Sequence, residues 1–181
     1  MTTEMWIIVA VRIAGALPVL RWPLAGAIIA MLVDLSDLFI RNLVDLGGVN
    51  DYQRFDKWLD QAYMLTFLVV ALRWDGAQRA VAVGLYGFRL LGFAAFEVSG
   101  ERGVLLAFPN LFEAWFLLIA GMRQFRLTWE RSRPLVMGAA AALLGVKLLQ
   151  EYALHAGQWF EGFTAVEAVE AIWEWATGWL W

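Results

Sequence analysis

MLVDLSDLFIRNLVDLGGVNDYQRFDKWLDQAYM, residues 31–64, decides how this chain must fold. An apolar run carries Asp34 and Asp37, and the next apolar run opens with Asp56 and Asp60. Spacings of three and four residues put each pair on one face of its helix. The segment between the two runs contains Gly47-Gly48, which predicts a turn. We therefore expect the four carboxylates to lie close together, at the same side of two adjacent helices.

The composition around this stretch is that of a membrane protein. The chain has 181 residues, of which 61% are hydrophobic and 17% are charged, and its mean hydropathy is +0.61. A soluble domain of this length would not expose so much apolar surface. The net charge of −3 is too small to indicate a nucleic-acid partner. The absence of cysteine excludes disulfides and thiolate metal sites.

Apolar periodicity predicts an all-α membrane protein with about six transmembrane helices in one bundle, because a bilayer core needs roughly 17–25 apolar residues per span. The N-terminus lacks a basic segment, so we expect the first span to be retained. Short connections make neighbouring helices antiparallel. The predicted spans cover residues 5–20, 24–43, 57–72, 77–96, 104–122 and 134–154.

Two parts of the chain are therefore expected, a transmembrane bundle over residues 1–157 and a C-terminal amphipathic helix over residues 158–181. In the second part Glu167, Glu170 and Glu174 form an acidic stripe opposite an apolar face. Such a helix lies in the membrane interface or packs against a partner subunit. The expected surroundings are a lipid bilayer and a homodimer or larger membrane assembly.

The basic residues predict the orientation. Positively charged side chains are enriched in cytoplasmic loops. One side of the predicted bundle carries seven of these basic residues and the other side carries four. The side with seven is therefore placed in the cytoplasm, and both termini lie outside. The seven are Arg21, Arg73, Arg79, Arg123, Arg126, Arg131 and Arg133, and the four are Arg41, Arg54, Lys57 and Arg102.

Converging carboxylates repel one another unless cations lie between them. Hard divalent ions such as Mg²⁺ or Mn²⁺ prefer oxygen ligands and can bridge carboxylates to phosphate oxygens. A carboxylate left outside the metal shell can act as a general base towards a hydroxyl. The sequence thus predicts a divalent-cation site of the kind that serves phosphoryl chemistry.

A simpler interpretation needs no metal. Asp56 and Asp60 fit first-turn positions favoured by the helix dipole. Arg41, Arg54 and Lys57 would then neutralise the four aspartates. This interpretation fits Asp34 poorly, because that residue lies about two turns inside an apolar helix, where an ionisable group indicates a functional site.

The acidic positions resemble the signature of the CDP-alcohol phosphatidyltransferases, DxxDGxxAR followed after eight residues by GxxxDxxxD. Asp34-Leu-Ser-Asp37 and Asp56-Lys-Trp-Leu-Asp60 match its aspartates in type, order and placement. Leu38 and Tyr52 stand at its glycine positions, and the gap between the pairs is one residue longer. The resemblance implies that Asp34, Asp37 and Asp56 bind metal and that Asp60 is the catalytic base, which activates a hydroxyl against the diphosphate of a CDP-linked substrate.

Further charges lie inside the predicted spans. Arg89 and Glu113 fall near the middle of theirs, Lys147 lies well inside the last, and isolated charges there would be costly. Arg89 with Glu113, and Lys147 with Glu151, are the expected pairs. These cations also suit a phosphate group. The candidate substrate-binding residues are Arg41, Lys57, Arg89 and Lys147, and the candidate network comprises Glu97, Glu113, Glu151 and His155.

Three local features complete the expectations. Pro109-Asn110 should kink the fifth span or move its start. Arg12 should either extend its charge to the interface or join the charged network. Close helix contacts are expected at Gly84, Gly87, Gly92 and Gly138.

Three functions fit these observations. The first is a metal-dependent membrane transferase or hydrolase acting on a lipid-linked diphosphate. The second is a small ion-coupled transporter with Asp34, Glu113, Arg89 and Lys147 as a relay. The third is a non-catalytic structural subunit of a membrane assembly.

Overall fold

The fold is all-α in a computed structural model that describes residues 2–43, 52–101, 103–151, 167, 173–175, 177 and 178. Side chains 37–43, 52–53, 129–133, 135–136, 150 and 151 are excepted from that description. No strand occurs among the described residues. The helices are α1 (Thr3–Ala16), the 3₁₀ turn η1 (Leu17–Leu20), α2 (Pro23–Leu43), α3 (Tyr52–Ala71), α4 (Gly76–Ser99), α5 (Gly103–Ala107), α6 (Leu111–Gln124) and α7 (Trp129–Glu151).

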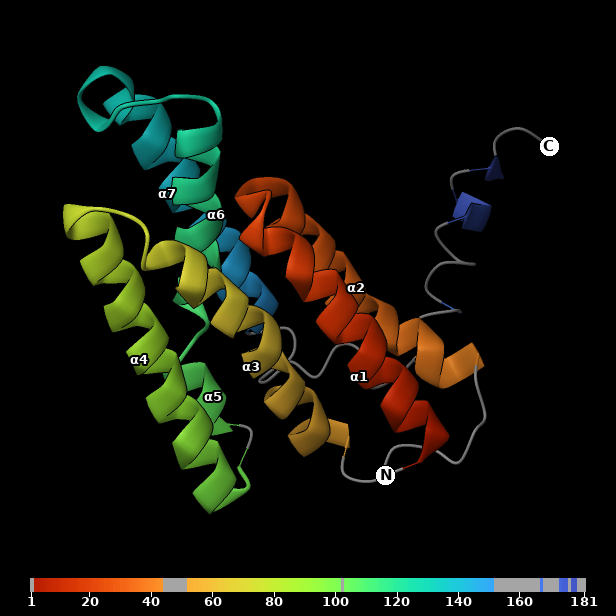
Figure 1. The fold of residues 1–181 in the computed structure, drawn as a ribbon. Helices are drawn as coiled ribbons and strands as arrows, with labels where there is room; N and C mark the ends of the chain where they lie inside the picture. Colours follow the sequence, from red (N-terminus) through yellow and green to blue (C-terminus); the bar gives the residue numbers. More distant parts are fainter. Residues whose placement is uncertain are drawn as a thin grey trace.

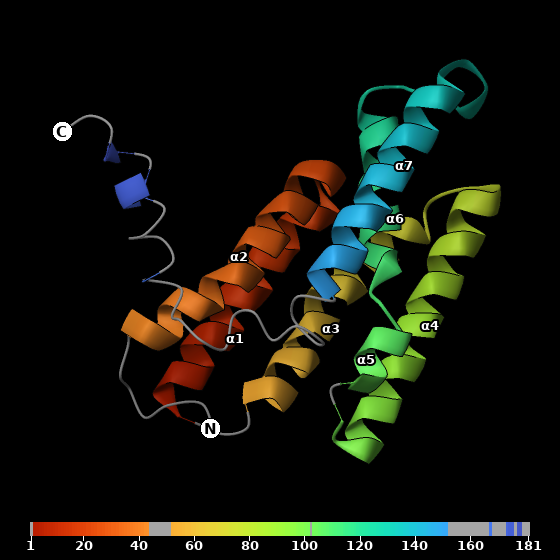
Figure 2. The ribbon, with the colours of Figure 1, turned by 180° about the vertical axis from the view of Figure 1, so that it is seen from behind.

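Helix α3 is the centre of the arrangement (Figure 1). It contacts α1 and α2 on one side and α4 and α6 on the other. Helix α7 packs against α6, as the view from behind shows (Figure 2). This position gives charged side chains of α3 partners on neighbouring helices, namely Arg12 of α1 for Asp56 and Asp60 and Glu97 of α4 for Arg54.

The helix ends follow from local chemistry. The Thr2 hydroxyl accepts a hydrogen bond from the Met5 backbone N–H and caps α1. Gly100 ends α4 in the left-handed conformation, with φ of 70°. Pro109 separates α5 from α6, since proline cannot donate the backbone hydrogen bond of a continuous helix. The predicted break at Pro109-Asn110 is confirmed.

The start of α3 corrects one expectation. The predicted third span began at residue 57, whereas the helix begins at Tyr52. Asp56 and Asp60 therefore lie beyond the first turn, where the helix dipole acts most strongly. The interpretation of these two residues as first-turn dipole partners is wrong.

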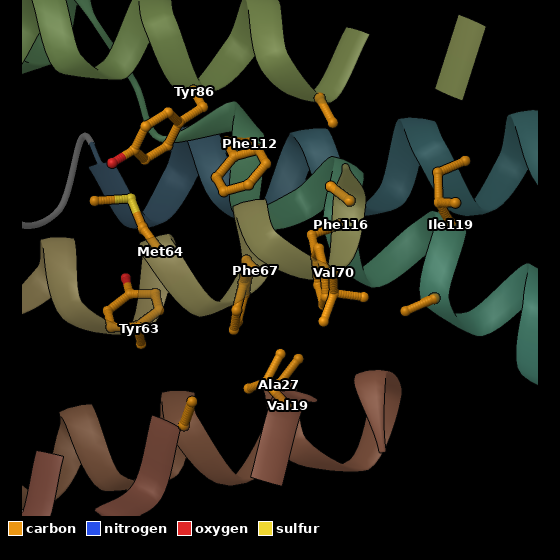
Figure 3. Packing of buried hydrophobic residues seen from close by; sticks show 14 of the residues in the cluster. Val19, Ala27, Tyr63, Met64, Phe67, Val70, Tyr86, Phe112, Phe116 and Ile119 are labelled. Carbon is orange, nitrogen blue, oxygen red and sulfur yellow. The ribbon is translucent and has the colours of Figure 1, made fainter. Parts of the chain in front are cut away.

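Aromatic side chains from α3 and α6 form the middle of the apolar core (Figure 3). The rings of Phe67 and Phe116 stack with their centroids 4.2 Å apart, and Trp74 stacks on Phe116 at 5.2 Å. Val19 and Ala27 close the opposite side of Phe67 from η1 and α2 (Figure 3). These contacts fix the rotation of α3, and with it the direction in which its acidic residues point.

Glycines set the closest helix approaches, at positions that differ in part from those expected. A Cβ at Gly92 would lie 2.3 Å from the Phe108 Cβ, which confirms that contact. Tight contacts that the sequence did not indicate occur at Gly15 and Gly26, the latter 2.3 Å from the Val19 backbone nitrogen. The expectation is wrong for Gly84, Gly87 and Gly138 within the described part of the chain, where a Cβ would have no neighbour within 4 Å.

Among the described residues, two helices are long and apolar enough to cross a membrane, namely the continuous stretch Thr3–Leu20 and α4, Gly76–Ser99. Shorter apolar stretches run over Pro23–Ser36 and Met137–Leu149 within the described residues. The bundle of about six spans and the division at residue 157 stay predictions. The expected helix over residues 158–181 falls largely outside the described part of the chain.

Candidate functional site

Arg12 of α1 lies among three carboxylates that come from two other helices. Its Nη1 forms an ion pair with Asp34 Oδ1 of α2 and donates to Asp60 Oδ1 of α3 at 3.1 Å. Its Nη2 donates to Asp56 Oδ1 at 2.5 Å. The Arg12 side chain is 3% exposed, so the guanidinium replaces solvent as the partner of these carboxylates. We name Arg12, Asp34, Asp56, Lys57 and Asp60 the acidic cluster.

Lys57 completes the cluster from within α3. Its Nζ donates to Asp56 Oδ2 at 2.7 Å and to Asp60 Oδ2 at 3.0 Å. Both oxygens of Asp56 and both oxygens of Asp60 therefore contact a cation. Asp34 Oδ1 differs, because it touches Arg12 but makes no hydrogen bond of ordinary geometry.

The three carboxylates converge closely enough to hold a metal ion. One oxygen each from Asp34, Asp56 and Asp60 lie within 4.8 Å of one another. Two ligands on opposite sides of a hard divalent ion are about 4–5 Å apart, because each lies roughly 2.0–2.6 Å from the ion. The all-oxygen donor set thus fits Mg²⁺ or Mn²⁺, and the Arg12 guanidinium lies where such a cation would be bound.

A second charged group lies on the α6 and α7 side of α3. Lys147 Nζ donates to Glu113 Oε2 at 2.6 Å, and Asn110 Nδ2 donates to the same oxygen at 3.2 Å. Tyr63 of α3 lies within electrostatic range of both Glu113 and Asp60. Both charged groups therefore act electrostatically on the same α3 side chain.

Arg89 of α4 is another buried cation, and it is 3% exposed. Its Nη1 donates to the Phe108 carbonyl at 2.9 Å, at the break between α5 and α6. Its Nε is buried without a hydrogen-bond partner, and its charge acts on Asp60. The expected Arg89–Glu113 ion pair is wrong, since Lys147 takes the Glu113 carboxylate instead. Arg89 is the described cation best placed to receive an additional anion.

Formal charges balance within the set made up of the acidic cluster, Arg89 and the Glu113–Lys147 pair, and Glu4 of α1 is a further buried carboxylate outside this set. Formal charges cancel because four carboxylates face four cations. The carboxylates are Asp34, Asp56, Asp60 and Glu113, and the cations are Arg12, Lys57, Arg89 and Lys147. Balance of this kind lowers the cost of placing charges in an apolar surrounding.

The remaining predicted site residues lie elsewhere. Glu97 pairs with Arg54, whose Nε lies 3.4 Å from its Oε2, so it does not join the acidic cluster. Asp37 and Arg41 belong to α2, but their side chains fall outside the described set, as does that of Glu151. His155 lies outside the described residues altogether. Their predicted roles stay predictions.

Arg12 is the site residue whose importance the sequence understated. It was expected to reach the interface or to join a network, and it joins the network at the centre of the aspartates. The only sequence signal is an arginine inside an apolar span, which calls for an anionic partner. Nothing in its spacing identifies that partner, because the contact joins residues 48 positions apart.

Comparisons with protein-family models, with curated proteins and with solved structures found no match to this chain. The resemblance to the CDP-alcohol phosphatidyltransferases therefore stays a prediction drawn from the four aspartates.

Proposed function

We propose that this chain is a multi-pass integral membrane protein that uses a divalent cation to transfer or hydrolyse a lipid-linked diphosphate. The observation that carries the proposal is the convergence of Asp34, Asp56 and Asp60, with carboxylate oxygens within 4.8 Å of one another. These residues come from the helices that the aspartate signature predicted. Their oxygen chemistry suits Mg²⁺ or Mn²⁺.

The distribution of polarity supports the membrane location. Charged side chains such as Arg12, Asp60 and Arg89 are buried, and many large apolar side chains outside the core face outward. Water favours the opposite arrangement, and a bilayer favours this one. Outward-facing apolar residues occur on several helices, among them Ile28, Leu32, Leu65, Leu91, Val98, Val146 and Leu149.

The helix lengths support several spans. Helices α2, α3, α4 and α7 have 21, 20, 24 and 23 residues. At a rise of about 1.5 Å per residue each reaches the roughly 30 Å of a hydrocarbon core. Asp34, Asp60 and Arg89 lie near the midpoints of their helices, so the proposed site is deep in the bundle. An aliphatic lipid chain could then remain in the bilayer while its phosphate end reaches the site.

Each charged residue has a role in this proposal. Asp34 and Asp56 would hold the ion together with Asp37, as the resemblance implies. A bound divalent ion would neutralise the diphosphate and make its phosphorus more electrophilic. Asp60 would accept the proton of the attacking hydroxyl. Arg89, with its free Nε, and Lys57 would bind phosphate oxygens.

Bond changes follow from these roles. The oxygen of an alcohol or of water bonds to the phosphorus that carries the lipid. The bond from that phosphorus to the bridging oxygen breaks, and the nucleoside monophosphate leaves with that oxygen. The hydroxyl proton passes to the Asp60 carboxylate.

Release of CMP from a CDP-linked diacylglycerol tests the proposal. Full-length protein in lipid nanodiscs should release CMP in the presence of Mg²⁺, and Asp60→Asn should abolish this because no base remains. Glu101→Gln, an exposed change outside the cluster, should leave the rate unaltered. Folded wild-type protein that releases no CMP, or an Asp60→Asn variant as active as wild type, would contradict the proposal.

A second candidate is a non-catalytic subunit whose buried charges fix helix packing. The balance of four carboxylates against four cations favours it, because such a network needs no ligand. This function predicts that Asp34→Asn lowers stability and that neither variant nor wild type binds Mn²⁺.

A further inference from the structure

The contacts of Arg12 bear on how metal binding at the acidic cluster is regulated. Arg12 reaches Asp34, Asp56 and Asp60 through the same kind of atom in each, Oδ1. Lys57 occupies Oδ2 of Asp56 and of Asp60. A divalent ion therefore finds no uncontacted oxygen on either aspartate of α3. Binding at this cluster has to be an exchange of one cation for another.

Arg12 is the cation placed to leave. Lys57 belongs to the same helix as Asp56 and Asp60, one and three residues away, so it stays near them whatever α1 does. Arg12 comes from α1, contacts all three carboxylates, and holds together α1, α2 and α3. Its contact with Asp34 Oδ1 lacks hydrogen-bond geometry, which leaves that oxygen the least well satisfied of the cluster.

We propose that Arg12 is a built-in counter-ion that occupies the divalent-cation position in the metal-free protein and is displaced when the metal binds. This inference rests on the proposed function. Arg12 keeps three buried carboxylates compensated in the absence of metal, and so it sets both the stability of the metal-free state and the affinity for the ion. Displacement also uncouples the Arg12 end of α1 from α3.

The affinity for Mn²⁺ tests this directly, because Mn²⁺ in solution gives an electron paramagnetic resonance signal that is lost on binding. Full-length wild type and Arg12→Gln are titrated in nanodiscs. Removing the competing charge should lower the Kd of Arg12→Gln by roughly tenfold or more, since an uncompensated buried carboxylate is costly. In EDTA the same variant should melt below wild type, and saturating Mn²⁺ should restore most of the difference.

Arg54→Gln is the matched control. It removes the same charge from the start of α3, but Arg54 pairs with Glu97 and its side chain is 50% exposed. Its Kd for Mn²⁺ should stay within about twofold of wild type, because exposed charges interact weakly. If Arg12→Gln and Arg54→Gln bound Mn²⁺ more tightly than wild type by the same factor, the effect would come from net charge, and the proposal would be overturned.

If Arg12→Gln fails to fold, two further variants keep the test decisive. They are Arg12→Lys and the double variant Arg12→Gln/Asp56→Asn. Lysine retains the positive charge but lacks the forked guanidinium contacts. The Kd of Arg12→Lys for Mn²⁺ should therefore fall between the values for wild type and Arg12→Gln. The double variant should fold in EDTA, because one charge of each sign is removed. Wild type that binds Mn²⁺ as tightly as Arg12→Gln or Arg12→Lys overturns the displacement. Absence of Mn²⁺ binding by every variant refutes the proposed function itself.

Discussion

At the scale of single residues, partner choice decides what each buried charge does. Glu113 accepts from Lys147 and Asn110, although Arg89 was the expected partner. Spacing along the chain could show that Glu113, Arg89 and Lys147 are buried charges. It could not show which of them meet, because this depends on how each helix is rotated about its own axis.

The Glu113–Lys147 ion pair gives a stability prediction. Glu113→Gln or Lys147→Met should each destabilise the protein by about 3–5 kcal/mol, because the remaining charge is left buried without its partner. The double variant should lose less than the sum, since neither charge remains. Unfolding in mixed micelles measures the three values. Strict additivity would show that the two side chains do not interact.

At the scale of helices, the contacts made by α3 position the site. Stacking of Phe67 and Trp74 on Phe116 holds the C-terminal part of α3, and the ion pairs of Asp56 and Asp60 hold its N-terminal half. The aromatic contacts and the ion pairs of α3 are formed together at one orientation of the helix about its own axis. The acidic residues therefore point towards α1 and α2 rather than outward.

The helices themselves were largely predictable. Apolar runs placed the spans near residues 24–43 and 77–96 close to α2 and α4, and the break at Pro109 follows from proline chemistry. The start of α3 was missed because Arg54, Asp56 and Lys57 interrupt the apolar pattern. Two of those charges pair across helices, Asp56 with Arg12 of α1 and Arg54 with Glu97 of α4, and no local pattern reveals these partners.

Close packing of α4 against the α5–α6 break predicts a difference between two glycines of the same helix. Gly92→Ala should destabilise by about 1–3 kcal/mol, because its Cβ would overlap the Phe108 side chain. Gly87→Ala should be neutral or stabilising by up to about 1 kcal/mol, since its Cβ meets nothing and alanine favours helix. Melting temperatures compare the two variants, and equal effects would refute the packing seen at Gly92.

At the scale of the whole molecule, the described residues combine an apolar core with a few buried charges, and many large apolar side chains face outward. Arg12, Asp60 and Arg89 are among these charges, and aliphatic side chains cover α2, α4 and α7. The sequence predicted the membrane class from composition alone. It could not reveal which charges pair across helices, such as Arg12 with Asp56 or Lys147 with Glu113, since that follows from how the helices pack.

The absence of cysteine makes the membrane location simple to test. Single cysteines at the outward-facing Leu91 and Val146 should resist a water-soluble maleimide, because lipid excludes it. Cysteines in place of Asp75 and Thr128 should react from one side of the membrane, and one in place of Glu101 from the other. Rapid labelling of Leu91→Cys and Val146→Cys in the bilayer would contradict the multi-pass arrangement.

Binding of Mn²⁺ to the full-length wild-type protein in nanodiscs tests the central claim most directly. We predict saturable loss of the free Mn²⁺ resonance signal, with Mg²⁺ in excess restoring it, and a Kd weakened by at least about tenfold in Asp34→Asn because a carboxylate ligand is lost. A wild-type titration that coincides with protein-free nanodiscs would contradict the claim, and would leave the buried charges a structural role alone.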